Sequence, residues 1–330
     1  REGMTSMSAG YVLPGTPREK ASAEDGAVAR IIARVSTEYV LRGFQLLVDT
    51  YGDIRAGLLV QAINIANVGY TDAQAEETRT AAGASGVFPD EMRRPVTIAR
   101  LADSAGLPFE SVRRVVQQLI GEGLCQRVPG GVIVPRTTIE RPENLRAVLA
   151  NVGYVRKFMR DLHAGGLIGQ VPASLAAAAT VDGTWVARLV TRLSSEYFLR
   201  ALELLADIYG DPRAGIVAQT IVAANTAHLD TREGGGWRYA GIGQPPPDEA
   251  RRPVSVSRIA ESLDLPYETV RRHVERLLEA DICVRTQGGV IVPAALMVSP
   301  AAVQAMLANV GYVRKFARDL DAVPPMPRPE

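Results

Sequence analysis

The chain contains two copies of one sequence, separated by a constant offset of 158 residues. LPFESVRR begins at Leu107, and LPYETVRR begins at Leu265. STEY, YGD, RRPV, GGVIVP and ANVGYVRKF recur at the same offset, identically or nearly so, and no insertion separates the copies. Between 93–135 and 251–293, 23 of 43 positions are identical. The copies are much longer than the ~20–50-residue repeats of solenoid proteins. We therefore expect a duplicated domain whose two copies share one fold.

The composition fits two globular units. Hydrophobic residues make up 47% of the 330 residues and charged residues 22%, so each copy can bury a core. The two cysteines, Cys125 and Cys283, are equivalent in the copies, and we expect buried free thiols, as suits a reducing cytoplasm. We find no apolar run near the ~20 residues of a membrane span, and no signal-peptide pattern. The net charge is only +1, so any surface for nucleic acid must be a local patch.

Hydrophobic spacing divides the chain into five segments. We predict an N-terminal tail at 1–24, a first repeat at 25–162, a connecting segment at 163–184, a second repeat at 185–320, and a C-terminal tail at 321–330.

Within each repeat the pattern predicts long helices at its two ends. These span 27–50 and 143–162 in the first copy, and 185–208 and 301–320 in the second. Gly52 and Gly210 are natural helix stops, and Asp211 with Pro212 can start the next helix. Residues 71–92 and 229–250 are rich in Gly and Pro, at least in the second copy, and are expected to be irregular.

A compact module follows the irregular segment. Val96 lies in a short segment whose sequence is typical of a β-strand, and Thr97 can cap the helix that follows. Pro108 opens a second helix with an i, i+4, i+7 and i+8 pattern of buried apolar residues at Val112, Val116, Leu119 and Ile120. LCQRV, a PGG turn and VIVP then alternate like a β-hairpin. The second copy repeats this order.

The second module, RRPVSVSRIAESLDLPYETVRRHVERLLEADICVRTQGGVIVP, resembles the DNA-binding part of bacterial winged helix-turn-helix regulators, GntR-type and MarR-type proteins in particular. The resemblance covers about 43 residues per copy. It implies a mainly α fold with small β-hairpin wings, in which two winged helix-turn-helix domains stand in tandem. It also implies that the second helix enters the major groove and that the wing touches the backbone or minor groove. The flanking helices resemble MarR-type dimerisation elements in layout only, and the two helices before the module depart from the GntR pattern.

The residues expected to contact DNA lie on the outward face of this helix, before the module and beside the wing turn. An Arg bonds guanine bidentately, a Gln does the same for adenine, and hydroxyls bond phosphate or base. The predicted set is Arg93, Arg94, Phe109, Glu110, Ser111, Arg113, Arg114, Gln117 and Arg127 in the first copy, and Arg251, Arg252, Tyr267, Glu268, Thr269, Arg271, Arg272, Arg276 and Arg285 in the second. In this set Arg93, Arg94, Arg251 and Arg252 are expected to clamp phosphates. The alternative for the Arg pairs is a solvated helix face, salt-bridged to neighbouring Glu.

The first module should hold phosphate more strongly. Residues 93–136 contain seven Arg and three acidic residues, for a net charge of +4, whereas 251–293 contain seven Arg and six acidic residues, for +1. The two helices also differ at Gln117/Glu275, Gln118/Arg276 and Val115/His273. These differences predict two non-identical half-sites.

No pattern in the sequence indicates an enzyme. His163, His228 and His273 occupy non-equivalent positions without metal-ligand spacing, and we expect no metal, no cofactor and no catalytic site. His273 is expected on the surface or facing DNA. Trp237 and Tyr239 are expected to anchor their loop on the core rather than to line a ligand pocket.

The duplication gives one chain the layout of the two-fold dimers common among such regulators. The four long helices would form the body of this covalent pseudo-dimer. We therefore predict a transcriptional regulator in the bacterial cytoplasm, at the nucleoid. It would read an imperfect inverted repeat of double-stranded DNA as a monomer or as a further homodimer. The alternatives are a plasmid-type replication initiator and a tandem winged-helix scaffold that binds proteins. The sequence identifies no small-molecule effector.

Overall fold

A computed structural model of the chain describes residues 23–69, 83, 85–105, 107–180, 183–229, 239 and 243–323. In these residues the fold is mainly helical, with two small antiparallel hairpins, and this level of the predicted fold class is confirmed. Nearly all of the predicted N-terminal tail, most of the C-terminal tail and of the two irregular segments, Gly106 and Trp237 lie outside the described residues.

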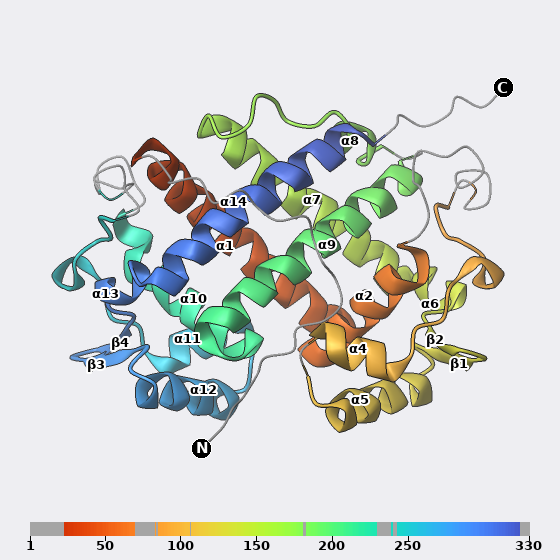
Figure 1. Cartoon of the computed structure of the whole chain (residues 1–330), viewed down its shortest axis with the longest axis horizontal. Coiled ribbons are helices and arrows are strands. Elements are labelled where there is room, and N and C mark those ends of the chain that lie inside the picture. Colours follow the sequence, from red (N-terminus) through yellow and green to blue (C-terminus); the bar gives the residue numbers. More distant parts are fainter. Residues whose placement is uncertain are drawn as a thin grey trace, which may run out of the picture.

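The elements follow one another in the same order in the two copies (Figure 1). The first copy contains α1 (Ala23–Tyr51), α2 (Ile54–Val68), η1 (Asp90–Met92), α4 (Ile98–Ala105), α5 (Phe109–Gly121), β1 (Gln126–Val128), β2 (Gly131–Ile133), α6 (Arg136–Ile139) and α7 (Pro142–Ala164). After α8 (Ser174–Ala177), the second copy contains α9 (Thr184–Tyr209), α10 (Pro212–Thr226), η2 (Ala227–Leu229), η4 (Asp248–Ala250), α11 (Val256–Leu263), α12 (Tyr267–Glu279), β3 (Val284–Thr286), β4 (Gly289–Ile291), α13 (Ala294–Met297) and α14 (Pro300–Asp321).

Two predicted helix boundaries have a visible local cause. Gly52 and Gly210 follow α1 and α9 with φ of 72° and 77°, the left-handed region that favours glycine. In the next turn, the Asp53 carboxylate accepts from the backbone N–H groups of Arg55 and Ala56. Asp211 caps α10 in the same way. A Gly–Asp pair therefore turns the chain sharply between the first two helices of each copy.

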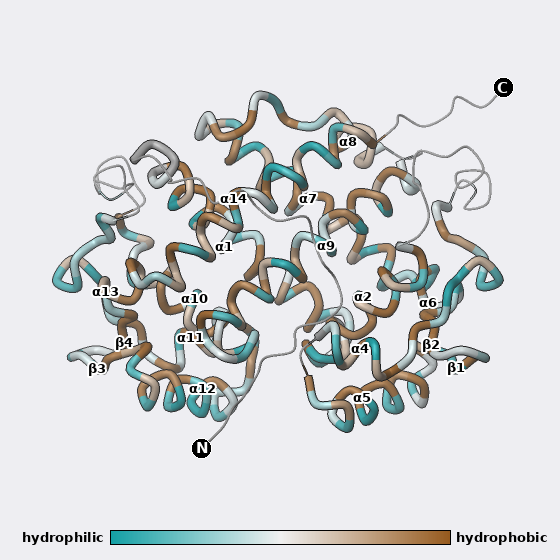
Figure 2. The backbone as a smooth tube through the Cα atoms, viewed as in Figure 1, coloured by the Kyte–Doolittle hydropathy of each residue, from teal (hydrophilic) through white to brown (hydrophobic). Residues whose placement is uncertain are grey.

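The four long helices form the centre of the molecule, as predicted. α1 packs against α7 of its own copy and against α14 of the other, while α9 packs against α14 and α7 (Figure 1). Buried apolar residues of all four helices, among them Ile32, Val155, Val190 and Val313, belong to one cluster. Hydrophobic and hydrophilic residues alternate along these helices in Figure 2. Residues from both copies thus share one buried core, arranged as an approximate two-fold pair.

Repeated polar residues cross this centre in equivalent pairs. Tyr39 donates to Asn151, and Asn151 donates to Ser194 of the other copy over 2.8 Å. Tyr197 and Asn309 make the same bridge back to Ser36, with hydrogen bonds of 3.1 and 3.0 Å. Burial raises the pKa of the two tyrosines, so both stay neutral donors. A satisfied buried network of this kind fixes one relative placement of packed helices.

An aromatic stack joins these bridges. The rings of Phe158, Tyr39, Tyr197 and Phe316 follow one another, with neighbouring centroids 5.1, 5.8 and 5.3 Å apart. Two of them belong to the STEY and SSEY segments and two to ANVGYVRKF. These repeated motifs therefore form a central part of the contact between the copies.

One residue upstream of each hairpin pairs with it through an isolated β-bridge: Val96 bridges Val132 in the first copy, and Val254 bridges Val290 in the second. Glycine is required beside this bridge, because a Cβ on Gly131 would lie 2.3 Å from the Val96 carbonyl oxygen. Its φ of 151° also disfavours any other residue.

One buried asparagine attaches each hairpin to the second helix. Asn67 on α2 donates to the carbonyls of Arg94 and Val132 over 2.8 and 3.2 Å, and accepts from the Val134 N–H at 2.9 Å. Asn225 on α10 makes the equivalent three bonds. A movement of α2 or α10 must therefore carry the hairpin with it.

The segment predicted to connect the copies packs onto the body. It contains α8, in which Leu175 is buried. Ser174 donates to the Leu320 carbonyl at 2.8 Å, and Arg156 donates to the Leu175 carbonyl at 2.9 Å.

Candidate nucleic-acid interface

The second helices of the two modules, α5 and α12, lie on the same face of the molecule. Both run along its lower edge in Figure 1, with the hairpins at the outer sides. Val112, Val116 and Leu119 are buried beneath α5, as their spacing predicted, and Val270, Val274 and Leu277 are buried beneath α12. The opposite side of each helix is consequently left for solvent or a partner.

An exposed aromatic residue begins each of these helices. Phe109 and Tyr267 each keep 51% of their surface accessible, although large apolar side chains are usually buried. Neither helix has a side-chain cap, because Pro108 and Pro266 occupy the capping positions. The Ser111 and Thr269 N–H groups donate to the carbonyls of these prolines, so only the N–H groups of the first two residues of each helix are available to an anionic group.

One arginine of each pair is held by a neighbouring glutamate. Arg113 makes a bidentate ion pair with Glu110, at 2.8 and 2.6 Å. Arg271 binds Glu268 in the same way and also contacts Glu275. These hydrogen bonds lower the pKa of Glu110 and raise that of Arg113. The alternative of a salt-bridged helix face thus describes this half of each Arg pair.

The other arginine of each pair is exposed. Among the described residues Arg114 has neither an ion pair nor a hydrogen bond, and Arg272 donates only to the Glu268 carbonyl, at 3.3 Å. Ser111, Gln117 and Arg276 are exposed too, and Thr269 is half-buried.

The hairpins and the start of each module add further exposed cations. Arg127 and Arg285 lie on β1 and β3, and Arg94 and Arg252 lie two residues before the bridging valines, all with exposed side chains. Their exposure leaves these four arginines accessible to a partner.

Arg93 and Arg251 correct the prediction. Their side chains are only 1% accessible, so they cannot clamp phosphates from this position. Arg93 donates to the Phe88 carbonyl and to Asn64, both at 3.2 Å, and lies 3.3 Å from Asp90. Asp90 also accepts from the Arg136 N–H at 2.7 Å. This arginine instead ties the irregular segment to the start of α6.

His273 corrects a second prediction. It is 7% accessible and faces α10, where its Nδ1 lies 3.8 Å from Asp211, so it neither lies on the surface nor faces DNA. Burial lowers its pKa, opposed by Asp211 and assisted by Arg213, Arg276 and Arg272. The equivalent Val115 is buried too. An apolar residue at the same position of the first copy therefore indicated burial of His273.

The sequence prediction missed Asn67 and Asn225, which hold the hairpins in place. Their recurrence at the constant offset was a signal for them. Both cysteines are buried as expected, and burial raises the pKa of each thiol to about 12.

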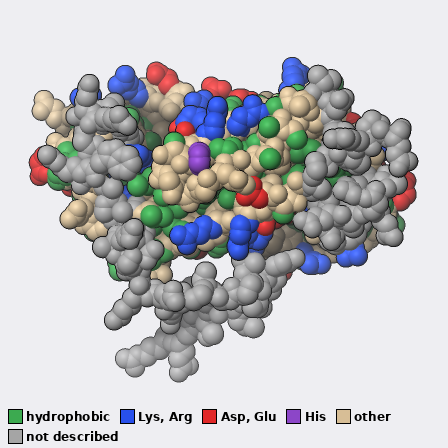
Figure 3. All heavy atoms as spheres, turned by 90° about the horizontal axis from the view of Figure 1, so that it is seen from above, with side chains coloured by type: hydrophobic (Ala, Val, Ile, Leu, Met, Phe, Trp, Pro, Cys, Tyr) green, Lys and Arg blue, Asp and Glu red, His purple; other side chains and the backbone are tan. Residues whose placement is uncertain are grey.

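Cations are not confined to the face of α5 and α12. From the opposite side, Lys and Arg gather in separate groups among apolar and acidic side chains (Figure 3). On α7, Lys157 pairs with Asp161 and with Glu38, at 2.6 and 3.0 Å. On α14, Lys315 pairs with Asp319. Local acids therefore neutralise part of the positive charge on these two helices.

Within the described ranges no helix is long and apolar enough to cross a membrane, and no cluster of His, Cys, Asp and Glu suits a metal ion. Comparison with family models of proteins, with curated proteins and with solved structures gave no match.

Proposed function

We propose that the protein is a sequence-specific DNA-binding transcriptional regulator, in which two winged helix-turn-helix modules on one chain read the two half-sites of an imperfect inverted repeat. The observation that carries this proposal is the placement of α5 and α12 on one face of the molecule, each with an exposed outward side. The central helices hold them in a fixed relation, as the body of a dimer would.

The chemistry of the exposed face supports base reading. Arg114 and Arg272 are free to reach base edges or phosphates, and Gln117 can pair with adenine. Because Glu110 orients the Arg113 side chain and pairs with its charge, Arg113 would position the helix on DNA more than it would attract DNA by its charge. The exposed Arg127 and Arg285 suit backbone contacts beside each groove.

A selection from randomised duplex DNA tests the proposal. We expect enrichment of one imperfect inverted repeat with half-sites about one helical turn apart, roughly 34 Å. Light scattering of the purified complex should give one chain per site. Failure to enrich any sequence, with binding independent of sequence at every salt concentration, would contradict specific recognition.

A protein-binding scaffold is the second candidate, and exposed Phe109 and Tyr267 favour it, since aromatic residues are common anchors of protein interfaces. Phe109→Ala plus Tyr267→Ala separates the two functions. A regulator should keep most of its salt-dependent DNA affinity, because phosphate contacts dominate that term. A scaffold should lose its protein partner and show no sequence preference on DNA.

A further inference from the structure

One large apolar position is exposed in both copies, at the start of the outward-facing helix of each module. Phe109 is the first residue of α5 and Tyr267 is the first of α12, and each keeps 51% of its surface accessible. Among the described residues no other large apolar side chain is exposed at equivalent positions of the two copies. The others that are exposed have half-buried or polar equivalents, and they are Leu107, Leu149, Val284 and Val298. Because burying an aromatic ring is favourable, two equivalent exposed rings indicate a partner that both modules contact.

The surroundings of each ring are too polar for a broad apolar docking patch. Exposed Glu110 and Ser111 follow the ring in α5, and Arg113 lies one turn further on. The second copy has Glu, Thr and Arg at the same positions. Leu107 is exposed two residues before the ring in the first copy, but its equivalent Leu265 is half-buried. Aromatic anchors of protein interfaces are usually surrounded by contacts that exclude water. A single ring among polar groups suits a small apolar group instead.

The major groove of DNA offers such a group. Thymine presents its C5-methyl group there, and Phe is among the side chains that contact it. The N-terminal residues of a recognition helix are the ones that reach base edges, and both rings occupy the first helical position. Cytosine carries a hydrogen at C5, whereas 5-methylcytosine carries a methyl group in the same place as thymine. The group that the ring can recognise is therefore a methyl at C5 of a pyrimidine.

The charges beside each ring favour a base edge over a phosphate. Arg113 pairs bidentately with Glu110, at 2.8 and 2.6 Å, so the two side chains together carry no net charge. Arg271 and Glu268 repeat this pair in α12. Phosphate is attracted instead by exposed Arg114 and by the free N–H groups of the first two residues of the helix. The ring can consequently lie against an uncharged part of a base while its neighbours hold the backbone.

We propose that Phe109 and Tyr267 each contact the C5-methyl group of one pyrimidine in the major groove, one ring in each half-site. Thymine or 5-methylcytosine supplies this methyl group, and cytosine lacks it. Methylation of a cytosine at this position therefore strengthens binding, which makes the methylation state of the DNA a regulator of the protein. This inference rests on the proposed function, and it names the chemical group that one residue of each module reads.

Synthetic duplexes that differ by one methyl group test the inference. In the site selected from randomised DNA, each thymine is replaced in turn by deoxyuridine, which removes only the methyl group. We expect one position in each half-site at which this change weakens binding of the intact chain about fourfold, the equivalent of ~0.8 kcal/mol for one buried CH2 group. Cytosine and 5-methylcytosine are then compared at that position, opposite guanine. The methylated base should bind about fourfold more tightly, so the two comparisons test the two sources of the methyl group separately.

Single variants assign the effect to the two rings. Phe109→Ala should abolish the methyl dependence of one half-site and Tyr267→Ala that of the other, because each variant lacks the ring that covers the methyl group. Phe109→Tyr and Tyr267→Phe, which exchange the residues of the two copies, should retain it. The matched control is Leu149→Ala on α7, where the side chain is 49% exposed, and it should leave the methyl dependence unchanged. Circular dichroism should match the parent for every variant, since all the replaced side chains are exposed.

The possible failures are distinguishable. Specific binding that is indifferent to every methyl group would overturn the inference and retain the proposed function. Methyl dependence that survives in both alanine variants, or that Leu149→Ala also removes, would overturn it as well. If the alanine variants lose a protein partner but bind every duplex like the parent, the rings anchor a protein and do not read bases. Absence of any enriched sequence would overturn the proposed function together with this inference.

Discussion

The two modules share most of their interior, with Val115/His273 as a buried exception, and differ mainly at the surface. Val112, Val116 and Leu119 beneath α5 match Val270, Val274 and Leu277 beneath α12, and all six are buried. The exposed positions changed instead, and they take the net charge from +4 in the first module to +1 in the second. Divergence after the duplication has therefore preserved most of the scaffold and altered the charge of its exposed surface.

The modules also differ in how they join the body. Buried residues of the first module form a cluster with α2 that is separate from the central core. Those of the second module are continuous with that core. This difference predicts that the first module can open by itself, whereas the second opens with the body.

The largest expected effect comes from one buried leucine in each module. Leu119→Ala and Leu277→Ala should each cost ~2–5 kcal/mol in free energy of unfolding, because each truncation leaves a cavity. Hydrogen exchange should then show faster exchange confined to α2, α4, α5 and the first hairpin for Leu119→Ala. For Leu277→Ala it should extend into α9 and α14. The same pattern of exchange in both variants would remove the distinction between the modules.

The next effect separates the members of one Arg pair. Arg114→Ala should weaken specific DNA binding by ~1–3 kcal/mol, the usual value of one good base contact. Arg113→Ala should cost less, because this side chain already pairs with Glu110. Fluorescence anisotropy on the selected site measures both, and Arg271→Ala with Arg272→Ala repeats the comparison in the second copy. A larger loss for Arg113→Ala would reverse the assignment.

Much of this fold was predictable because long helices carry their own periodicity. The four central helices, the Gly52 and Gly210 stops and the hairpins all appear where local pattern placed them. The four-residue helices α6 and α13 were missed, since four residues are too few for a hydrophobic period. One-turn 3-10 helices also lie within the segments expected to be irregular.

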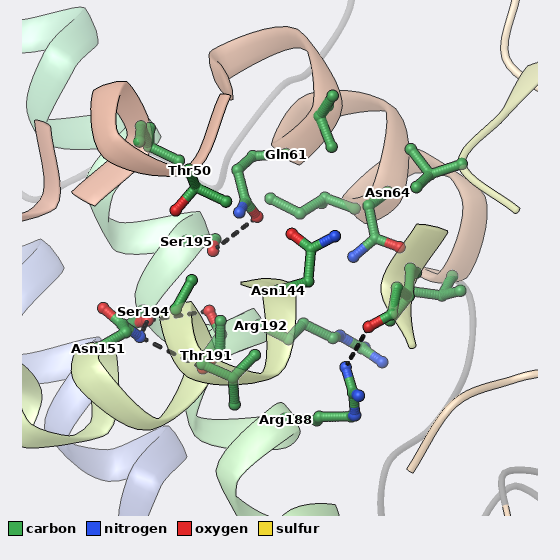
Figure 4. A pocket seen from close by; sticks show the side chains of 18 of the residues that line it. Thr50, Gln61, Asn64, Asn144, Asn151, Arg188, Thr191, Arg192, Ser194 and Ser195 are labelled. Carbon is green, nitrogen blue, oxygen red and sulfur yellow. Dashed lines mark hydrogen bonds between the residues drawn. The ribbon is translucent and has the colours of Figure 1, made fainter. Parts of the chain in front are cut away.

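The candidate site was less predictable where distant backbone decides burial. The carbonyl of Phe88 and the side chain of Asn64 enclose Arg93, and nothing in RRPV indicates either partner. A pocket lined by Tyr39, Arg188 and Phe198 (Figure 4) exists because helices from both copies meet there, which no single segment encodes. His273 was a different error, since the apolar Val115 at the equivalent position pointed to burial.

A smaller change should follow from exchanging one surface residue between the modules. Gln117→Glu replaces a side chain that can pair with adenine by one that can accept only from a cytosine amino group. We combine this change with Gln118→Arg and repeat the selection. The preferred first half-site should become more like the second, with a change in binding free energy of ~1 kcal/mol, the low end of the range for one base contact. The reverse pair, Glu275→Gln with Arg276→Gln, serves as the control. An unchanged preference, or a perfect palindrome for the parent, would show that these positions do not read bases.

The smallest expected effect is a pH dependence confined to the second module. Burial of His273 lowers its pKa below the ordinary value of 6.5, so the unfolded chain binds the proton more readily than the folded one. Stability of this module should therefore fall as pH decreases from about 7 through the lowered pKa, and one pKa unit corresponds to only ~1.4 kcal/mol. Asp211 opposes the shift, while Arg213, Arg272 and Arg276 add to it. His273→Val, which installs the residue of the first copy, should flatten the difference between melting at pH 7 and pH 5, and Val115→His should introduce that difference into the first module. If His273→Val leaves the loss of stability between pH 7 and pH 5 unchanged, another group titrates in this range. The buried histidine is then only a packing difference between the copies.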